Sequence, residues 1–561
     1  MLSRVAAVKA PRTHNRRRVT GSSGRRREGR ESEPQRPHIF RHLFYSAVLL
    51  LVVMMCCGAG GGAAQAAGQS SQKKFEWKEI KDEGEGVTVK SLGAPGLLKV
   101  GNDVFAVAEA QCKKNSDSIT FTGIASQIIT IDNADKPMEV LNGAEDKTQV
   151  LEEKGSEDSK KKVDVSRPTT VVEGKDIYMI AGTYSSNPTD DCQDGADVAN
   201  LKLLLVKGQV SDEENKKIHW KDAHTLPCTF LNQEHKSWTR LTGGGGSGVT
   251  MEDGTLLFPV EGTRKVETAG DTETDEKTVS LIIHFLEDTN NWKLSKGIPD
   301  GGCSDPSVVE WKDEKLMMMT ACDDGRRRVY ESGDKGESWT EALGTLSRVW
   351  GNKQDEGVKA VRSGFITATI DGDEDNRNVM LVTLPVYSEE DSKKETGNGK
   401  GKLHLWLTDN THIVDIGPVS DDDVAASSLL YKSAGSGDNE QKEELIALYE
   451  KKKKGDEKPS PGMVSVPLTA QLQRVKDVLA TWKKADDLVS KLCPSESAVE
   501  SDSTGNACRD FKITDGLVGF LSGNFSENTW RDEYLGVNAT VKGNDEVGET
   551  GVIRQQRLPM V

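Results

Sequence analysis

Short apolar runs separated by turn residues dominate the chain between Lys74 and Ser465. The runs are rich in aliphatic and β-branched residues and lie at 96–108, 169–181, 254–260, 307–320 and 378–385. Several have GN, EGK or KDEK at a hairpin turn, and they return at intervals of tens of residues, as the blades of a β-propeller do. The pattern predicts an all-β domain over residues 68–465.

Three charged insertions interrupt this pattern, at 145–162, 270–277 and 388–402. They are rich in acidic residues or lysine and have no apolar periodicity. Such segments cannot bury enough apolar surface to order themselves. We therefore expect mobile, solvated loops between or within the blades.

Residues 468–492 have a different periodicity. Apolar side chains recur at close to 3.6 residues, and Pro467 stands in front as a helix-start signal. The segment predicts an amphipathic helix, within a linking region at 466–493, whose apolar stripe packs against the β domain as an ordinary packing helix does.

The first 67 residues have the pattern of a basic leader and signal peptide. They carry 12 Lys and Arg against three Glu, and the 14 apolar residues at 44–57 are too short for the ~20 that a bilayer span needs. Small residues follow at 58–67, so we expect cleavage near Ala64 or Ala67. An uncleaved N-terminal anchor is the alternative. Cleavage would leave no transmembrane span and place the protein in the secretory pathway.

The charge balance narrows the range of partners. The whole chain has a formal net charge of −16, and because the leader contributes +9, residues 68–561 carry −25. This surplus repels a phosphate backbone, so nucleic acid is excluded as a partner.

The cysteines outside the leader point to disulfides and not to a metal or cofactor site. No pair has CxxC spacing and no HxxxH motif occurs. In an oxidising compartment seven cysteines allow up to three disulfides. We expect Cys493 to pair with Cys508 across a short polar loop, and Cys192 with Cys228 is a weaker candidate. Sequons for N-glycosylation at Asn524 and Asn538 also suit a secreted surface.

One motif is specific. Ser332, Asp334, Gly336 and Trp339 fit the Asp-box pattern S-x-D-x-G-x-[ST]-W. We expect a tight turn in which the aspartate accepts backbone N–H bonds, the glycine has positive φ and the tryptophan packs beneath. Residues 285–292 look like a decayed second copy. The motif is structural and indicates a sialidase-type propeller.

Longer segments extend this likeness. Residues 301–311, 329–351, 403–410 and 516–521, together with the arginine-rich leader, closely resemble the trypanosomal trans-sialidase family. The resemblance implies a six-bladed sialidase-type β-propeller, a linking helix and a lectin-like β-sandwich. In many members of the family a glycolipid anchor follows.

In the family, three arginines bind the carboxylate of the substrate sialic acid, because a guanidinium group donates two parallel hydrogen bonds to a carboxylate. At the matching positions this chain has Gly93, Ala321 and Lys400. The resemblance therefore implies that the forked clamp is lost and that only the point charge of Lys400 remains.

The family's catalytic groups are also altered. The nucleophilic tyrosine is replaced by Ala426, and the glutamate that activates it by Asp305. Asp117 is a candidate remnant of the acid/base, and a substrate-binding aspartate is replaced by Arg167. Tyr431 stands five residues along the strand from Ala426, which changes both position and face, so we do not expect it to substitute.

Two further segments complete the prediction. The run at 326–328 (RRR) is expected to be a solvated strand edge and not an anion site. Residues 494–561 are expected to be the truncated start of the sandwich, since only 53 residues follow Cys508 and such a domain needs roughly a hundred. Residues 548–561 do not resemble an anchor signal.

The resemblance thus implies a monomeric, secreted or surface glycoprotein without catalysis. Its role would be contact with host cell-surface glycans or proteins, adhesion or antigenic display. Residual exo-α-sialidase or trans-sialidase activity through Asp117 and Asp305 is the alternative, and a poorly folded gene product is the third.

Overall fold

The computed structural model describes most of the chain between residues 75 and 492 and three short segments beyond it. The gaps are 84–85, 115–118, 131–135, 154–160, 186–202, 213–214, 227–237, 268–273, 287–290, 300, 343–345, 351–360, 371–376, 388–400, 435–442 and 453–461, and the later segments are 525–526, 529–530 and 539–540. The chain divides into Met1–Gln72 and Lys73–Val561, and all the described residues belong to the second unit. The predicted leader and its predicted cleavage site lie outside the described residues.

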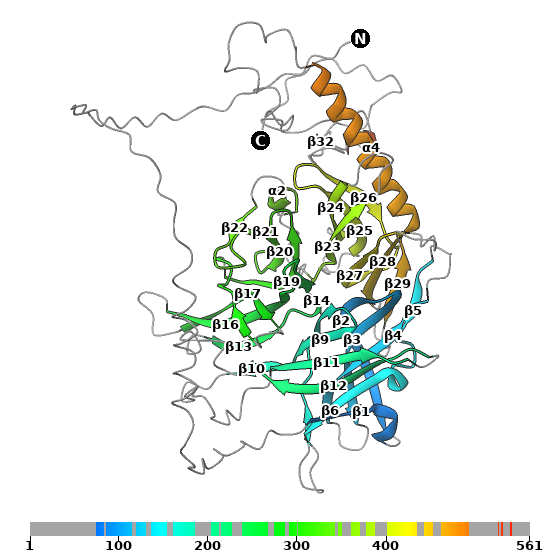
Figure 1. Ribbon diagram of the computed structural model, residues 1–561, viewed down its shortest axis with the longest axis vertical. Coiled ribbons are helices and arrows are strands. Elements are labelled where there is room, and N and C mark those ends of the chain that lie inside the picture. The colour runs from blue at the N-terminus through cyan, green and yellow to red at the C-terminus, as the bar shows by residue number, and fades with distance from the viewer. Residues whose placement is uncertain are drawn as a thin grey trace, which may run out of the picture. The chain divides into compact units, whose positions relative to one another are not determined.

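Strands dominate the described residues and form sheets of three to six strands, paired antiparallel except for one short parallel pair (Figure 1). The first sheet contains β1 (Phe75–Glu79), β6 (Thr148–Glu153), β4 (Thr120–Ile128), β3 (Asp103–Lys114) and β2 (Val87–Val100), with β7 (Lys161–Val163) beside β6. The second contains β12 (Ile218–Thr225), β11 (Leu204–Val210), β9 (Asp176–Ala181), β8 (Thr169–Glu173) and β14 (Gly246–Ser247). The third contains β10 (Thr183–Ser185), β13 (Trp238–Gly243), β16 (Leu256–Glu267), β17 (Thr274–Leu286) and β18 (Asn291–Leu294), with β15 (Val249–Thr250) beside β16.

Three four-stranded sheets follow. They contain β19 (Cys303–Trp311), β20 (Lys315–Cys322), β21 (Arg327–Ser332) and β22 (Thr340–Glu341); β23 (Phe365–Ile370), β24 (Arg377–Tyr387), β25 (Gly401–Thr408) and β26 (Ile413–Pro418); and β27 (Val424–Lys432), β28 (Glu444–Lys451), β29 (Met463–Pro467) and β5 (Met138–Val140). Helices are few among the described residues. Three are short: η1 (Ile80–Glu83), η2 (Ala144–Lys147) and α2 (Leu346–Trp350). One is long: α4 (Thr469–Leu492).

The sequence pattern located these strands well. Each apolar run singled out above falls on one or two strands, and the GN, EGK and KDEK turns join β2 to β3, β8 to β9 and β19 to β20. The all-β fold with a helix after it is confirmed. Six blades and the domain boundaries remain predictions, although the described strands of residues 75–467 do form six sheets.

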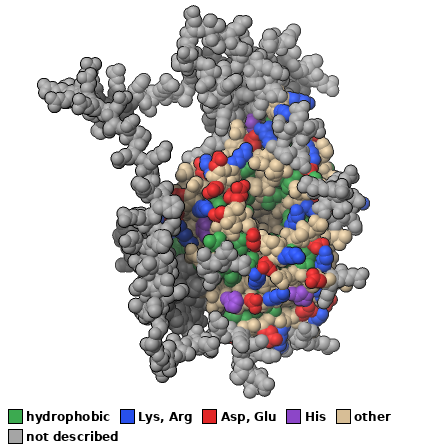
Figure 2. Space-filling model, in the orientation of Figure 1, with side chains coloured by type: hydrophobic (Ala, Val, Ile, Leu, Met, Phe, Trp, Pro, Cys, Tyr) green, Lys and Arg blue, Asp and Glu red, His purple; other side chains and the backbone are tan. Residues whose placement is uncertain are grey.

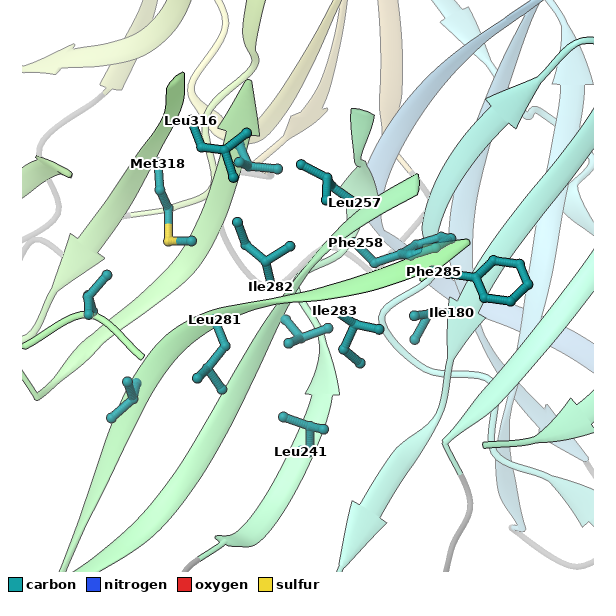
Figure 3. Close-up of a cluster of buried hydrophobic side chains, with 14 of the residues drawn as sticks. Ile180, Leu241, Leu257, Phe258, Leu281, Ile282, Ile283, Phe285, Leu316 and Met318 are labelled. Carbon is teal, nitrogen blue, oxygen red and sulfur yellow. The ribbon is translucent and has the colours of Figure 1, made fainter. Parts of the chain in front are cut away.

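The core lies between neighbouring sheets. In the largest cluster, Leu257, Phe258 and Ile283 from β16 and β17 pack with Ile180 of one adjacent sheet and Met318 of the other (Figure 3). Side chains on successive strand residues point to opposite faces, so each central sheet contributes to two such layers. Strands buried on both faces explain the nearly continuous apolar runs in the sequence.

The last of these sheets is completed by an early part of the chain. β5 pairs antiparallel with β29, with Val140 opposite Met463 and Met138 opposite Ser465. The first and last parts of the β domain are therefore joined by backbone hydrogen bonds.

The prediction of solvated loops is wrong for parts of two of the three charged insertions. Residues 145–162 contain β6, which pairs with both β1 and β4, and Val150 and Leu151 are fully buried. The charged residue next to them, Glu152, is not solvated, because it forms ion pairs with Lys78 and Lys162. Residues 274–277 begin β17, paired with β16, while 388–400 lie outside the described residues.

The Asp-box residues form the tight turn between β21 and β22. Asp334 accepts bonds from the Ser332 hydroxyl and the Ser338 N–H, both at 2.8 Å, and Gly336 has φ of 86°. The Trp339 ring nitrogen donates to the Lys296 carbonyl at 2.9 Å. Hydrogen bonds from the Ser338 hydroxyl and N–H lower the pKa of Asp334 to about 2. In the decayed copy, Phe285 stacks on Trp292.

A disulfide joins Cys303 to Cys322, which lie directly opposite each other on β19 and β20. This pair was not predicted, because their sequence separation of 19 residues gives no sign of strand register. Cys112 is buried and free, and burial raises the pKa of its thiol to about 12. The cysteines of both predicted pairs and both sequon asparagines lie outside the described residues.

The predicted helix is α4, and it packs its apolar stripe on the β domain beside β26 and β28. Trp482, 1% exposed, is the largest buried side chain of the helix: the ring stacks on His412 with centroids 4.8 Å apart, and the Arg377 guanidinium lies 5.5 Å from it. Asp409 bonds to both His412 and Arg377. Within the described part of the chain, no helix has the length and apolar character to cross a membrane.

Only short strands are described in the expected sandwich region. β30 (Phe525–Ser526), β31 (Thr529–Trp530) and β32 (Ala539–Thr540) form one antiparallel sheet. Residues 516–521, one of the segments that resemble the trans-sialidase family, lie outside the described residues.

We expect Trp482→Ala to lower the free energy of unfolding by about 3–5 kcal/mol, because it leaves a cavity between the helix and the β domain. Chemical denaturation followed by circular dichroism measures the loss. The neighbouring exposed substitution Thr481→Ala is the control and should change stability by no more than about 0.5 kcal/mol. Equal effects of the two would contradict the anchoring role of Trp482.

Candidate functional site

A repeated backbone device marks the site. Ala94, Arg167 and Asp305 each precede a proline, and they have φ of 49°, 50° and 50°. Positive φ is uncommon for residues other than glycine, and a following proline further restricts the backbone conformations that the preceding residue can adopt. The pairing of β2 with β3 and of β19 with β20 shifts register at Ala94 and Asp305. Three separate parts of the β domain thus turn a residue out of the regular pleat in the same way.

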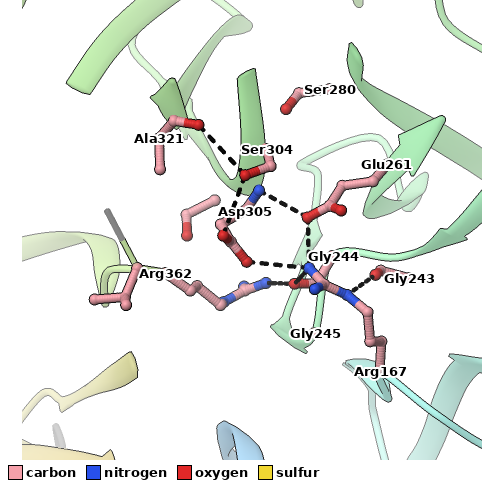
Figure 4. Close-up of polar contacts among 12 residues, drawn as sticks. Arg167, Gly243, Gly244, Gly245, Glu261, Ser280, Ser304, Asp305, Ala321 and Arg362 are labelled. Atoms are coloured by element: carbon pink, nitrogen blue, oxygen red, sulfur yellow. Dashed lines mark hydrogen bonds and ion pairs between the residues drawn. The ribbon is translucent and has the colours of Figure 1, made fainter. Parts of the chain in front are cut away.

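Arg167 is the hub of the site (Figure 4). Its Nη2 forms ion pairs with Glu261 and, at 3.1 Å, with Asp305. The Nε donates to the Gly243 carbonyl at 2.8 Å and Nη2 to the Gly244 carbonyl at 3.1 Å. Its backbone N–H donates to Glu109 at 2.7 Å, so the residue ties together segments far apart in the sequence.

The charged groups of this hub shift one another's pKa values. Burial raises the pKa of Glu261, whose side chain is 13% exposed, while the positive charge of Arg167 opposes that rise. Burial alone would lower the pKa of Arg167, but Glu261, Asp305 and Glu109 raise it above its ordinary value. Arg167 therefore stays charged and offsets part of the negative charge of the two carboxylates beside it.

A second guanidinium lies across the same glycine loop. Arg362 donates from Nη1 to the Gly244 carbonyl at 2.8 Å and from Nη2 to the Ser247 carbonyl at 3.0 Å, and burial lowers its pKa to about 10. A Cβ at Gly246 would stand 2.7 Å from Arg362 Nε, and the φ of Gly246 is 68°. Only glycine fits there.

Arg327 corrects the expectation of a solvated strand edge. Arg326 is exposed and Arg328 pairs with Asp324, but Arg327 is only 4% exposed. Its Nη1 donates to the Val361 carbonyl at 2.9 Å and to the Ser363 hydroxyl at 2.7 Å. Burial lowers its pKa to about 10.

The structure brings most of the predicted positions to this neighbourhood. Arg167 and Asp305 are in direct contact, and Gly93 lies opposite Glu109. The Ala321 carbonyl accepts a bond from the Ser304 hydroxyl at 3.4 Å, beside Asp305. Ala426 lies in an irregular stretch of β27, next to Ser427, whose N–H donates to the Arg362 carbonyl at 3.1 Å.

Other predicted residues are elsewhere or not described. Tyr431 donates its hydroxyl to the Thr369 carbonyl at 3.2 Å and to Glu443 at 2.8 Å. Asp117 and Lys400 lie outside the described residues. In the part of the chain that is described, no three His, Cys, Asp or Glu side chains are arranged to hold a metal ion.

Sequence reasoning missed several residues of the site, among them Glu109, Glu261, Arg362 and Glu450. Glu109 follows the apolar run at 104–108 and Glu261 directly follows the apolar run at 256–260, a signal that could have singled them out. Burial and the charge of Glu109 raise the pKa of Glu450, which β28 places opposite the irregular stretch at Ala426.

The sheets and the residues that meet between them define a sialidase-type β-propeller protein. Residues 94–450 match the family described as a BNR repeat-like domain, and residues 513–556 match the trans-sialidase C-terminal domain. The chain belongs to the trans-sialidase-like family.

Individual relatives agree with this assignment. "Sialidase 85-1.1" of Trypanosoma cruzi is 30% identical over 474 residues, which are 82% of this chain and 56% of that protein. A sialidase of Clostridium perfringens is 32% identical over 164 residues, 29% of this chain and 40% of that one. The structure of Trypanosoma rangeli sialidase with the inhibitor DANA matches with a TM-score of 0.57 and 28% identity, over 82% of this chain and 67% of that one. The chain thus spans about half the length of the first of these relatives.

We expect Arg167→Met to cost about 2–3 kcal/mol of folding stability at pH 8, because it leaves two carboxylates without their cation. The native state binds the proton of Glu261 more tightly than the unfolded chain does, so stability falls as pH rises through its raised pKa. Without Arg167 that pKa rises further, and the deficit relative to the parent should grow between about pH 5 and pH 8. Urea unfolding across this range measures it.

The matched control is Lys90→Met, which removes one exposed positive charge from β2. It should leave stability within about 0.5 kcal/mol of the parent at every pH. A deficit in Arg167→Met that did not change with pH would mean that Glu261 does not titrate as proposed.

Proposed function

We propose that the protein binds host cell-surface glycans or proteins without hydrolysing sialosides. The observation that carries the proposal is the pairing of Arg167 with Glu261 and Asp305. In the family to which the chain belongs, a carboxylate at the position of Asp305 activates the nucleophile. Here one oxygen of Asp305 accepts from Arg167 and the other from the Ser304 hydroxyl.

The lost side chains support the same conclusion. Gly93 and Ala321 offer no guanidinium to a sugar carboxylate, and Ala426 offers no hydroxyl to the anomeric carbon. A charge-assisted hydrogen bond contributes about 1.5–3 kcal/mol, so two missing arginine contacts weaken binding by roughly two to four powers of ten. Catalysis would lose the covalent nucleophile in addition.

A polar recess lies at the turn that joins β20 to β21. A cavity of about 430 Å³ is lined by Gly302, Cys322, Asp323, Asp324 and Arg328 among others, immediately after Ala321 in the chain. Figure 2 shows acidic and basic side chains intermingled on the visible face of the described residues. A polar, mixed-charge recess suits recognition of a glycan or protein by hydrogen bonds.

The sequence features outside the described residues fit this role. The leader and the two sequons support an extracellular or surface location for a monomeric glycoprotein. Residual sialidase activity through Asp117 and Asp305 is the competing function, favoured by the names of the relatives.

The full chain, secreted from a eukaryotic host, should show no turnover of a fluorogenic α-sialoside and no transfer from sialyllactose to lactose. Trypanosoma rangeli sialidase is the positive control for hydrolysis, and Asp305→Ala is the matched variant. Parent and variant should both remain at the blank rate. Turnover that Asp305→Ala abolishes would overturn the proposal in favour of the enzyme.

Binding is measured separately, as retention on immobilised mammalian glycoprotein before and after desialylation. Retention in either state supports the receptor role, and the comparison identifies the sugar that is bound. Absence of retention on glycoprotein and on intact mammalian cells would refute it.

A further inference from the structure

The disulfide between Cys303 and Cys322 closes the end of the β19–β20 hairpin that carries Asp305. The two cysteines lie directly opposite each other on the paired strands. Shortly after Cys303 the pairing shifts register, so Asp305 and Pro306 form no regular pair with β20. The disulfide is therefore a covalent tie placed at the start of an irregular stretch of backbone.

Asp305 occupies a conformation that its surroundings must enforce. Its φ is 50°, and such backbone strain persists only where neighbouring contacts hold it. One carboxylate oxygen accepts from Arg167 at 3.1 Å and the other from the Ser304 hydroxyl at 3.2 Å (Figure 4). That hydroxyl also lies 3.4 Å from the carbonyl of Ala321, the residue before Cys322. The disulfide thus fixes both strands beside the contacts that place Asp305 on Arg167.

The two cysteines of the disulfide differ in their access to solvent. Cys303 is fully buried, whereas Cys322 is 6% exposed and lines the recess of about 430 Å³ together with Gly302 and Asp323. Thiol–disulfide exchange depends on access to the sulfur that is attacked. A small thiol that enters the recess therefore meets Cys322 first and displaces Cys303.

The charges of the recess favour a cationic thiol. Three carboxylates and two cationic groups line it, and they belong to Glu276, Asp323, Asp324, Lys277 and Arg328. Arg328 is already paired with Asp324 at 2.8 Å. The remaining surplus of negative charge attracts a positively charged thiol and repels an anionic one.

We propose that Cys322 is a modification site for small cationic thiols, and that cleavage of its disulfide releases Asp305 from Arg167. The thiolate attacks the Cys322 sulfur, the bond to Cys303 breaks, and the Cys303 sulfur leaves with the electron pair and takes a proton from water. Cys322 then carries the thiol as a mixed disulfide. A second thiolate can attack the sulfur of the attached thiol and free Cys322, so that two thiols are oxidised to one disulfide as the protein disulfide is reduced. This reaction is independent of the ligand that the protein binds.

Treatment of the folded full chain with cysteamine at pH 8, followed by alkylation and peptide mapping by mass spectrometry, tests the modification. The adduct should lie on Cys322 and the alkyl group on Cys303. Both should appear over minutes to hours, because a thiolate that leaves into an apolar core leaves slowly. At equal thiolate concentration, cysteamine should react about threefold faster than the anionic mercaptoethanesulfonate. No cleavage within a day, an adduct on Cys303 alone, or equal rates for the two thiols would overturn the proposal.

A double-mutant cycle tests the release of Asp305. Removal of the disulfide by Cys303→Ala with Cys322→Ala should make Asp305→Asn less harmful, because the contact with Arg167 is already weakened. Asp305→Asn should raise the unfolding equilibrium constant by a factor at least threefold smaller in this background than in the parent. Asp313→Asn, at the exposed turn of the same hairpin, is the control and should have the same effect in both. Equal effects of Asp305→Asn in the two backgrounds would contradict the release.

If the double-alanine chain does not fold, hydrogen exchange of the cysteamine-treated parent replaces the cycle. The backbone N–H of Asp305, which donates to Glu261 at 2.7 Å, should exchange at least tenfold faster after treatment. Residues 308–310, which pair regularly with β20, should not change. Unchanged exchange at Asp305 would sink the inference, and so would a loss of protection throughout the chain. Either result leaves retention on glycoprotein, and with it the proposed function, standing.

Discussion

The ion pairs that hold Arg167 between Glu261 and Asp305 are the interaction on which the site depends. Two carboxylates close together away from water repel each other, and a guanidinium between them removes the repulsion and satisfies two carbonyls of the glycine loop as well. The positive charge is thereby used within the protein. A site whose charges are paired internally in this way leaves less of its electrostatic field for a bound molecule.

Three residues of the site share a strained backbone conformation. Ala94, Arg167 and Asp305 all keep a left-handed conformation before proline, which costs of order 1–3 kcal/mol at each position. Such strain persists only where the surrounding sheets enforce it. The sheets therefore hold these three positions in a fixed backbone conformation.

Patterns local in sequence were predictable and those that depend on register were not. The Asp-box turn, the hairpins and α4 follow from spacings of two to four residues. By contrast, the disulfide from Cys303 to Cys322 and the burial of Arg327 opposite Ala321 depend on which strand residues face each other. The segment that forms β6 was predicted to be a loop because its charged residues outnumber the few apolar residues that are buried. At the site, a resemblance located Arg167 and Asp305, but nothing in the sequence joined them to Glu261.

The pairing of β5 with β29 has a consequence for biosynthesis. More than three hundred residues separate the two strands, so the ribosome must release nearly the whole β domain before the last sheet can be completed. Until then β28 and β5 present open edges, which are templates for pairing with other nascent chains. Contacts this distant in sequence also slow folding. A protein built this way depends on chaperones during synthesis, and its yield in a foreign host will respond to growth temperature more strongly than its final stability suggests.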